Sequence, residues 1–126
     1  MNAQIQYDFS LKTLNTFGMD VKCARFIRIE QESDIADIAK ADLFDAPCYI
    51  LGGGSNTLFT KNFDGTVIQP AFTGIEIKEE NNDEVLLRVA AGEKWDDLIT
   101  YCIENQLYGI ENLAGIPGLV GSSPVQ

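Results

Sequence analysis

The stretch at residues 49–59, YILGGGSNTLF, places three consecutive glycines directly after a short apolar run. Glycine loses more backbone freedom on folding than any other residue, so residues 52–54 need some compensating gain. One interpretation is a tight turn whose backbone takes positive φ angles. The other is a loop whose backbone N–H groups bind an anion, with Ser55 and Asn56 adding polar side chains. This stretch alone leaves both interpretations open.

The familiar phosphate-binding motifs do not fit this loop. The dinucleotide motif G-x-G-x-x-G would start at Gly52 and would need a glycine at the position of Thr57. The P-loop motif requires a Gly-Lys pair, and the chain contains none. A phosphate-binding loop at this place would therefore be of a less common type.

Composition describes an ordinary globular chain. Its 126 residues are 45% hydrophobic and 22% charged, which suits one domain with a core. The net charge of −10 argues against nucleic-acid binding, because that function relies on a basic surface. No apolar run approaches the length of a membrane span, and the first ten residues lack the layout of a signal peptide. We therefore predict a cytoplasmic protein.

Cysteine and histidine content restricts the possible chemistry. The cysteines Cys23, Cys48 and Cys102 form no C-x-x-C pair, and we interpret them as reduced core residues rather than catalytic thiols. The chain has no histidine, which excludes Ser-His-Asp and Cys-His catalysis and a histidyl-linked cofactor within it. The same absence argues against a zinc site, and we predict no metal site.

Around the glycines, residue periodicity predicts an α+β chain. Alternation predicts a strand at residues 25–30, and residues 33–44 have helical spacing with Ser33 as N-cap. Residues 48–51 are expected to form a short buried strand. Together these segments predict a β-α-β unit with parallel strands, whose second strand leads into the glycine loop.

Further elements are expected on both sides of this unit. Residues 1–14 lack sustained periodicity and are predicted to be flexible, and the NTFG segment at 15–18 is predicted to be a turn. Downstream, we expect a strand at 65–70 after a turn at Asp64-Gly65, and a hairpin of strands at 74–80 and 84–92. A helix follows at 93–107. Its predicted buried stripe comprises Trp95, Leu98, Ile99, Cys102 and Ile103, with Trp95 interpreted as core rather than as a cofactor-stacking residue.

A second unusual stretch closes the sequence. Residues 111–126, ENLAGIPGLVGSSPVQ, carry a glycine at every third position from 115 to 121, with apolar residues between them. Glycines allow close approach of the backbone to a flat apolar ligand, and prolines restrict the loop's shape. Taken alone, the pattern is more typical of a connector between subdomains. The sequence stops here without a closing strand, helix or polar tail, so we expect a piece of a longer protein.

These segments, taken in order, resemble one family. The chain is similar to the amino-terminal part of the bacterial UDP-N-acetylenolpyruvoylglucosamine reductases, also called UDP-N-acetylmuramate dehydrogenases. The segments that carry the resemblance are NTFG (15–18), ILGGGSNTLF (50–59), GTVIQ (65–69), AGEKWDDLI (91–99) and ENLAGIPGLVGSSPVQ (111–126). The resemblance implies an FAD-binding fold of the p-cresol methylhydroxylase or vanillyl-alcohol oxidase type. Residues 15–126 would form the amino-terminal part of the FAD domain, with the rest of that domain and the substrate domain absent.

The resemblance also implies cofactor-binding residues. In the family, the Gly-x-Gly-Ser-Asn loop holds the pyrophosphate of FAD, and the IPG segment lies along the flavin. The first group implied here is Leu51, Gly52, Gly53, Gly54, Ser55, Asn56, Thr57 and Leu58. The second group is Gly115, Ile116, Pro117, Gly118, Gly121, Ser122, Ser123 and Pro124. The NTFG segment is typical of the family, but neither its chemistry nor the resemblance assigns it a role.

The family reaction sets the expected function. Family members take a hydride from NADPH onto FAD and pass a hydride to the enolpyruvyl group of a UDP-sugar, which yields UDP-N-acetylmuramate for peptidoglycan. No position in this chain matches the family's catalytic arginine, serine and glutamate. We therefore expect FAD-binding loops but no catalytic residue, and a chain that is catalytically incomplete by itself.

Two other functions stay open. One is an FAD-dependent oxidase of the same superfamily, although a histidine-tethered flavin is excluded in this region because histidine is absent. The other is a non-catalytic nucleotide-binding or interaction module that uses the glycine loops structurally. The IPG segment favours the reductase over the oxidase.

Overall fold

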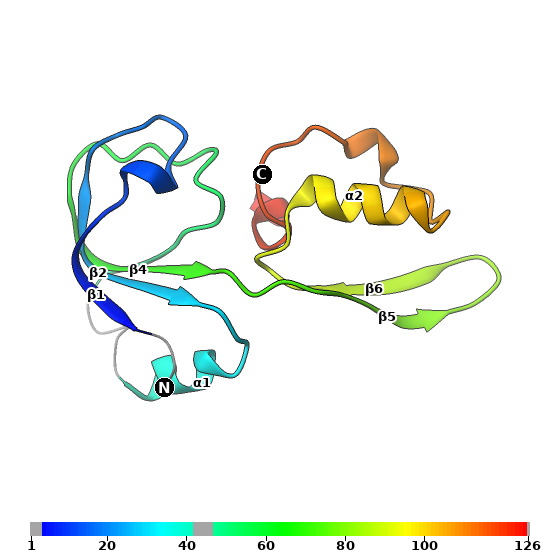
Figure 1. The fold of residues 1–126 in the computed structure, drawn as a ribbon, viewed down its shortest axis with the longest axis horizontal. Coiled ribbons are helices and arrows are strands. Elements are labelled where there is room, and N and C mark those ends of the chain that lie inside the picture. Colours follow the sequence, from blue (N-terminus) through cyan, green and yellow to red (C-terminus); the bar gives the residue numbers. More distant parts are fainter. Residues whose placement is uncertain (1–3, 42–46, 126) are drawn as a thin grey trace. The chain divides into compact units, whose positions relative to one another are not determined.

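The computed structural model describes residues 4–41 and 47–125, and the chain divides into two compact units, Met1–Phe72 and Thr73–Gln126. Both units contain strands and helices, so the predicted α+β class is confirmed. Figure 1 shows the elements in sequence colours, with the first unit from blue to green and the second from light green to red. Each unit is described by itself below.

A four-stranded sheet forms the centre of the first unit. Its strands are β1 (Ile5–Ser10), β2 (Lys22–Ile29), β3 (Cys48–Ile50) and β4 (Phe63–Pro70), in the order β1-β2-β4-β3. Strand β1 pairs antiparallel with β2, and β4 runs parallel to both β2 and β3. The predicted strands β2 and β3 are therefore parallel, but β4 lies between them.

The central place of β4 follows from its burial. Residues 65–69 are all buried, and a strand buried on both faces belongs in the interior of a sheet. The predicted strand forms at 48–50, but it lies at the sheet edge and is exposed, with 68% of Ile50 accessible. The predicted burial is found only at Leu51, which follows the strand. Gly65 is part of β4 rather than of a preceding turn, and a side chain there would overlap the Pro47 carbonyl.

Helix α1 (Asp34–Lys40) follows β2, as the sequence predicted. Ser33 lies at the N-cap position of α1, as predicted, but it has helical backbone angles and its side chain makes no capping hydrogen bond. Ile38 is buried against the sheet residues Ile27 and Ile68, whereas Ile35 is 44% exposed. Residues 42–46, which the prediction placed in the same helix, lie outside the described residues.

The prediction of a flexible segment at the amino-terminal end is wrong for residues 5–14. They form β1 and a short 3-10 helix, η1 (Lys12–Leu14). Asp8 has a positive φ of 51°, but the register of β1 with β2 is the same on both sides of it. The strand is held across the sheet, where the Phe9 and Phe26 rings stack with centroids 4.1 Å apart.

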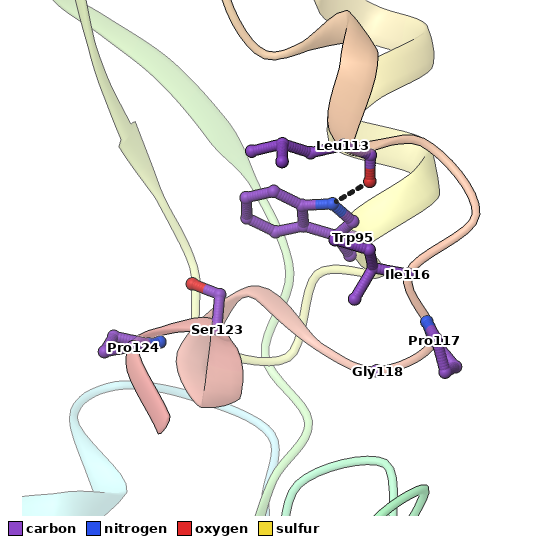
Figure 2. Close-up of a pocket in the computed structure, with 7 residues that line it drawn as sticks. All are labelled: Trp95, Leu113, Ile116, Pro117, Gly118, Ser123 and Pro124. Carbon is purple, nitrogen blue, oxygen red and sulfur yellow. Dashed lines mark hydrogen bonds between the residues drawn. The ribbon is translucent and has the colours of Figure 1, made fainter. Parts of the chain in front are cut away.

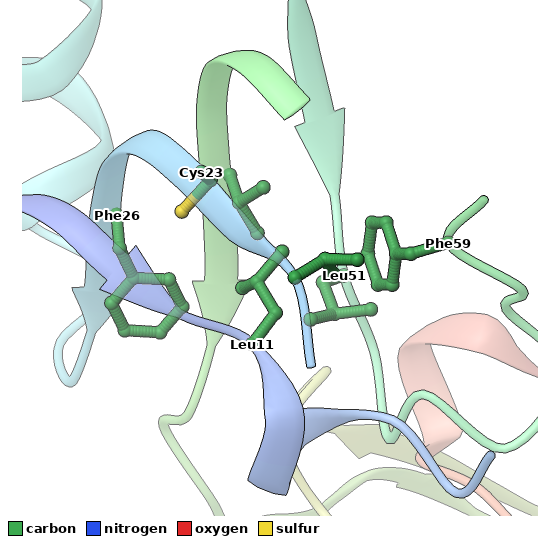
Figure 3. Close-up of a cluster of buried hydrophobic side chains, with 7 residues drawn as sticks. Leu11, Cys23, Phe26, Leu51 and Phe59 are labelled. Atoms are coloured by element: carbon green, nitrogen blue, oxygen red, sulfur yellow. The ribbon is translucent and has the colours of Figure 1, made fainter. Parts of the chain in front are cut away.

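The main core of the first unit surrounds the start of the glycine loop. Figure 3 shows Leu51, the last residue before the glycines, packed among buried side chains from the segment after β1, from β2 and from the loop. The cluster comprises Leu11, Val21, Cys23, Phe26, Leu51, Phe59 and Val67. One end of the glycine loop is therefore anchored in a hydrophobic core.

The second unit combines a hairpin and a helix, as predicted. Strands β5 (Ile75–Glu80) and β6 (Val85–Val89) pair antiparallel, and the Asn81 side chain accepts hydrogen bonds from two backbone amides in the turn. Helix α2 (Trp95–Glu104) follows, and then the 3-10 helices η2 (Glu111–Leu113) and η3 (Val120–Val125). The buried stripe of α2 is narrower than predicted and consists of Leu98, Ile99 and Cys102. Within the described residues, no helix is long and apolar enough to cross a bilayer.

We predict that Leu51→Ala lowers the free energy of unfolding by about 2–5 kcal/mol, because it opens a cavity in the core that anchors the loop. The neighbouring Ile50→Ala is the matched control, since this side chain is mostly exposed. It should cost about 0.5 kcal/mol or less. Urea denaturation of both variants tests the prediction, and equal losses would contradict it.

Candidate functional site

The glycine loop connects β3 to β4 and is held by its carbonyl groups. The Gln69 side-chain amide donates to the Gly52 carbonyl at 3.3 Å, and the Thr16 backbone N–H donates to the Gly54 carbonyl at 3.1 Å. Within the described residues of the first unit, the amides of residues 52–54 have no assigned hydrogen-bond acceptor. Backbone amides without an acceptor inside the protein are a feature that an anion-binding loop requires.

The requirement for glycine at position 54 comes from a backbone contact within the protein. Its φ is 67°, and a Cβ on its backbone would overlap the Leu14 carbonyl oxygen and lie 3.0 Å from the Asn15 Cα. The turn interpretation is therefore confirmed at this position. A backbone-to-backbone contact, rather than a ligand, accounts for this glycine.

A pocket of about 370 Å³ lies beside the glycine loop. Three of the predicted site residues, Asn56, Thr57 and Leu58, are among those that line it. The Tyr49 and Thr57 side chains both line this pocket, and their hydroxyl oxygens lie 3.1 Å apart. Lys61 adds a positive charge to the lining. The pocket therefore presents hydroxyl, amide and ammonium groups next to the loop.

In the second unit, the glycine-rich segment is tied to the start of α2. The Trp95 indole N–H donates to the Leu113 carbonyl at 2.8 Å, as Figure 2 shows, and the Trp95 backbone N–H donates to the Gly118 carbonyl at 3.1 Å. The Asp96 carboxylate accepts a hydrogen bond from the Gly115 N–H at 2.8 Å. Gly115 and Gly118 both have positive φ angles, of 80° and 129°. Two neighbouring helix residues therefore hold the shape of this loop.

These contacts enclose a mainly apolar pocket of about 290 Å³ (Figure 2). Its lining consists of Trp95, Leu113, Ile116, Pro117, Gly118, Ser123 and Pro124. Five of these residues belong to the group implied by the family resemblance, while Trp95 and Leu113 do not. Trp95 is half-buried and forms a wall of the pocket, so its interpretation as a core residue is corrected.

The remaining predicted residues of this segment have structural contacts. Gly121 packs on Ala91, since a Cβ there would lie 2.7 Å from the Ala91 Cβ. The Ser122 hydroxyl donates to the Leu119 carbonyl at 2.8 Å. The two groups of predicted site residues lie in different units, and each group is brought together within its own unit.

Sequence reasoning missed the residues that support the loops. Trp95 was assigned to the core because helical spacing reports which face of a helix is apolar, but not what covers that face. Asp96 resembles any acidic residue near a helix start, a place where negative charge is ordinarily favourable. Thr16 had no assigned role because its partner lies 38 residues further along the chain.

The cysteines offer no reactive thiol. Burial raises the pKa of the Cys23 and Cys102 thiols, so both stay protonated near neutral pH. Cys48 is exposed, which corrects its prediction as a core residue, although desolvation also raises the pKa of its thiol. Among the described residues, no group of three or more His, Cys, Asp or Glu side chains is placed to hold a metal ion.

Known proteins resemble this chain over most of its length. A family model described as an FAD binding domain matches residues 23–126. A UDP-N-acetylenolpyruvoylglucosamine reductase of Bacteroides fragilis is 39% identical over 97% of the chain, and one of Shewanella sediminis is 43% identical over 97%. These alignments cover 37% and 36% of the two relatives, so the chain spans about a third of the length of the curated relatives it matches.

A solved structure has a similar fold. The crystal structure of UDP-N-acetylenolpyruvylglucosamine reductase from Thermus caldophilus aligns with a TM-score of 0.66 and 24% identity. The alignment covers 97% of this chain and 41% of that one. At this identity the likeness supports the fold alone.

We predict that Gly54→Ala destabilises the protein more than Gly18→Ala. Both residues have φ near 65°, so each substitution should cost about 1 kcal/mol in backbone strain. Only the Gly54 substitution must also displace the Leu14 backbone, which should add about 2 kcal/mol or more, because Gly18 has nothing within 4 Å. Thermal or urea unfolding measures the difference, and equal costs would mean that the contact with Leu14 is not tight.

We also predict that Asp96→Ala releases the Gly115 amide. Its hydrogen exchange should accelerate at least about tenfold, because the substitution removes the acceptor of that N–H. Asp97→Ala is the matched control, since it removes the same charge from the same helical turn but not the acceptor. Comparable exchange of Gly115 in the two variants would contradict the assignment.

Proposed function

The chain belongs to the family of FAD-binding domains, and on that premise we propose that it is the amino-terminal part of a UDP-N-acetylenolpyruvoylglucosamine reductase. The observation that carries the proposal is the identity of about 40% to reductases of this name over nearly the whole chain. The complete enzyme would reduce UDP-N-acetylglucosamine enolpyruvate to UDP-N-acetylmuramate in the cytoplasm, with NADPH as hydride donor. That product serves peptidoglycan and cell-wall synthesis.

The residues of each unit fit a different part of FAD. In the first unit, the amides of residues 52–54 suit the pyrophosphate, and Ser55 and Asn56 add polar groups beside them. In the second unit, Ile116, Pro117 and Trp95 give the pocket an apolar wall that suits a flat ring system. Bound FAD would supply hydride transfer between NADPH and the UDP-sugar.

Backbone groups, rather than cations, would carry the phosphate interaction in this chain. The net charge of −10 repels a dinucleotide at long range, but solvent ions screen that field over about 10 Å. Oriented N–H groups act at hydrogen-bond distance and are not weakened in this way. The chain's own contribution to the reaction is to bind and orient the cofactor, and the proton donor and substrate contacts would come from other residues of the complete enzyme.

FAD binding can be tested on this chain through its single tryptophan. We predict that FAD quenches Trp95 fluorescence along a saturable curve, because Trp95 lines the pocket proposed for the flavin. N-acetyltryptophanamide at the same FAD concentrations corrects for absorption and collisional quenching. A curve that matches the free fluorophore would contradict binding in this pocket.

A pair of variants makes that test specific. Ile116→Glu places a charge in the pocket and should weaken the apparent FAD affinity at least about tenfold. Val125→Glu adds the same charge to an exposed side chain outside the pocket lining and should leave the affinity within about twofold. Activity is tested separately in the complete enzyme, where NADPH oxidation must depend on added UDP-N-acetylglucosamine enolpyruvate.

A further inference from the structure

The NTFG turn at residues 15–18 contacts the glycine loop from a distant part of the sequence. The Thr16 hydroxyl lies 3.3 Å from both the Gly54 and the Ser55 carbonyl oxygens, and the Thr16 N–H donates to the Gly54 carbonyl at 3.1 Å. The Leu14 carbonyl occupies the space where a side chain of Gly54 would be. One face of the loop is therefore shaped by the segment that contains this turn.

Asn15 makes the turn rigid. Its side chain is buried, with an exposed fraction of 6%. Its amide nitrogen donates to the Leu11 and Met19 carbonyls at 2.8 and 3.1 Å, and its oxygen accepts from the Met19 N–H at 2.9 Å. A side chain that uses both donor hydrogens and its acceptor on backbone groups holds those groups in one arrangement. Thr16 thus presents its hydroxyl and N–H from a fixed position.

The opposite side of the loop is held independently. Leu51 is buried in the core and its N–H donates to the Ile68 carbonyl at 2.8 Å, while Gln69 donates to the Gly52 carbonyl. The carbonyls of Gly52 and Gly54, at the two ends of the glycine run, thus both accept hydrogen bonds from other parts of the first unit. Since a peptide unit is planar, holding its carbonyl also orients the N–H on the far side of the same bond.

We propose that residues 15–18 are a positioning element for diphosphate binding. Asn15 fixes the turn, and Thr16 holds the carbonyls of Gly54 and Ser55 so that the loop amides keep a geometry ready for the anion. This inference rests on the proposed function, because it assumes that the glycine loop binds the diphosphate of the cofactor. It assigns to the NTFG segment a role that acts through the loop and not through contact with the ligand.

The test uses Thr16→Val, which removes the hydroxyl at nearly constant volume, and Thr16→Ser, which restores it. Thr13→Val is the matched control, because Thr13 is an exposed threonine in the neighbouring η1 helix. ADP probes the diphosphate interaction without a flavin, and riboflavin probes the flavin interaction without a diphosphate. Backbone amide NMR of residues 52–56 reports ADP binding, and Trp95 fluorescence reports riboflavin binding.

We expect Thr16→Val to weaken ADP binding about three- to tenfold, the effect of one lost hydrogen bond. Riboflavin binding should stay within about twofold of the wild-type value, and Thr16→Ser should recover most of the ADP affinity. Thr13→Val should behave as wild type. The amide resonances of Ser55 and Asn56, whose N–H groups share peptide planes with the carbonyls that Thr16 holds, should move in ligand-free Thr16→Val but not in ligand-free Thr13→Val.

The outcomes separate this inference from the proposed function. If ADP shifts none of the loop amides in the wild-type chain, the proposed cofactor role of the loop is wrong and the inference falls with it. If wild type binds ADP and Thr16→Val binds it equally well, only the inference is overturned. Equal weakening of ADP and riboflavin without recovery in Thr16→Ser would also overturn it, since that pattern indicates a general loss of structure.

Discussion

The contact between the Gly54 backbone and the Leu14 carbonyl is the constraint on which the first unit's loops depend. It leaves no room for a side chain at position 54, where the backbone also has a positive φ. The contact joins the turn after β1 to the loop after β3, two segments that are separated by almost forty residues in sequence. Because of this contact, interactions within the protein shape the glycine loop at Gly54.

The same physical solution recurs in the second unit. There the start of α2 holds a glycine-rich segment through the Trp95 indole and the Asp96 carboxylate. In both units, glycines allow a close approach or a positive φ, and polar groups from another segment then restrict the resulting freedom. Flexible residues thus become ordered loops, which limits the entropy that binding would otherwise cost.

This arrangement suits an acidic chain that belongs to a family of dinucleotide-binding domains. In the proposed role, backbone amides would provide short-range attraction for phosphate without added cations, and the tethered IPG segment would provide an apolar wall. The proposed positioning residues would contribute to binding by holding other groups, so a list of ligand contacts would not include them. They would keep the loop geometry in the absence of ligand.

Local patterns in the sequence predicted a large part of this structure. The alternation and the Asn-Asn-Asp turn predicted the β5–β6 hairpin, and helical spacing predicted α1 and α2. The ordered motifs indicated a reductase with an FAD-binding domain, and the matching family model confirms the FAD-binding domain. Each of these signals lies within a short segment or in a fixed order of short segments, so it can be read without three-dimensional information. The individual cofactor contacts stay predictions.

The tertiary structure alone decided which segments meet. It placed β4 between β2 and β3, paired β1 with β2, and brought Thr16 to the carbonyl of Gly54. It also placed Trp95 in a pocket wall rather than in a core. These outcomes depend on burial and hydrogen bonding between residues far apart in sequence. The sequence by itself therefore determined most of the elements, though not β1 and η1, and the FAD-binding family, whereas long-range packing decided the strand order and the residues that hold the loops.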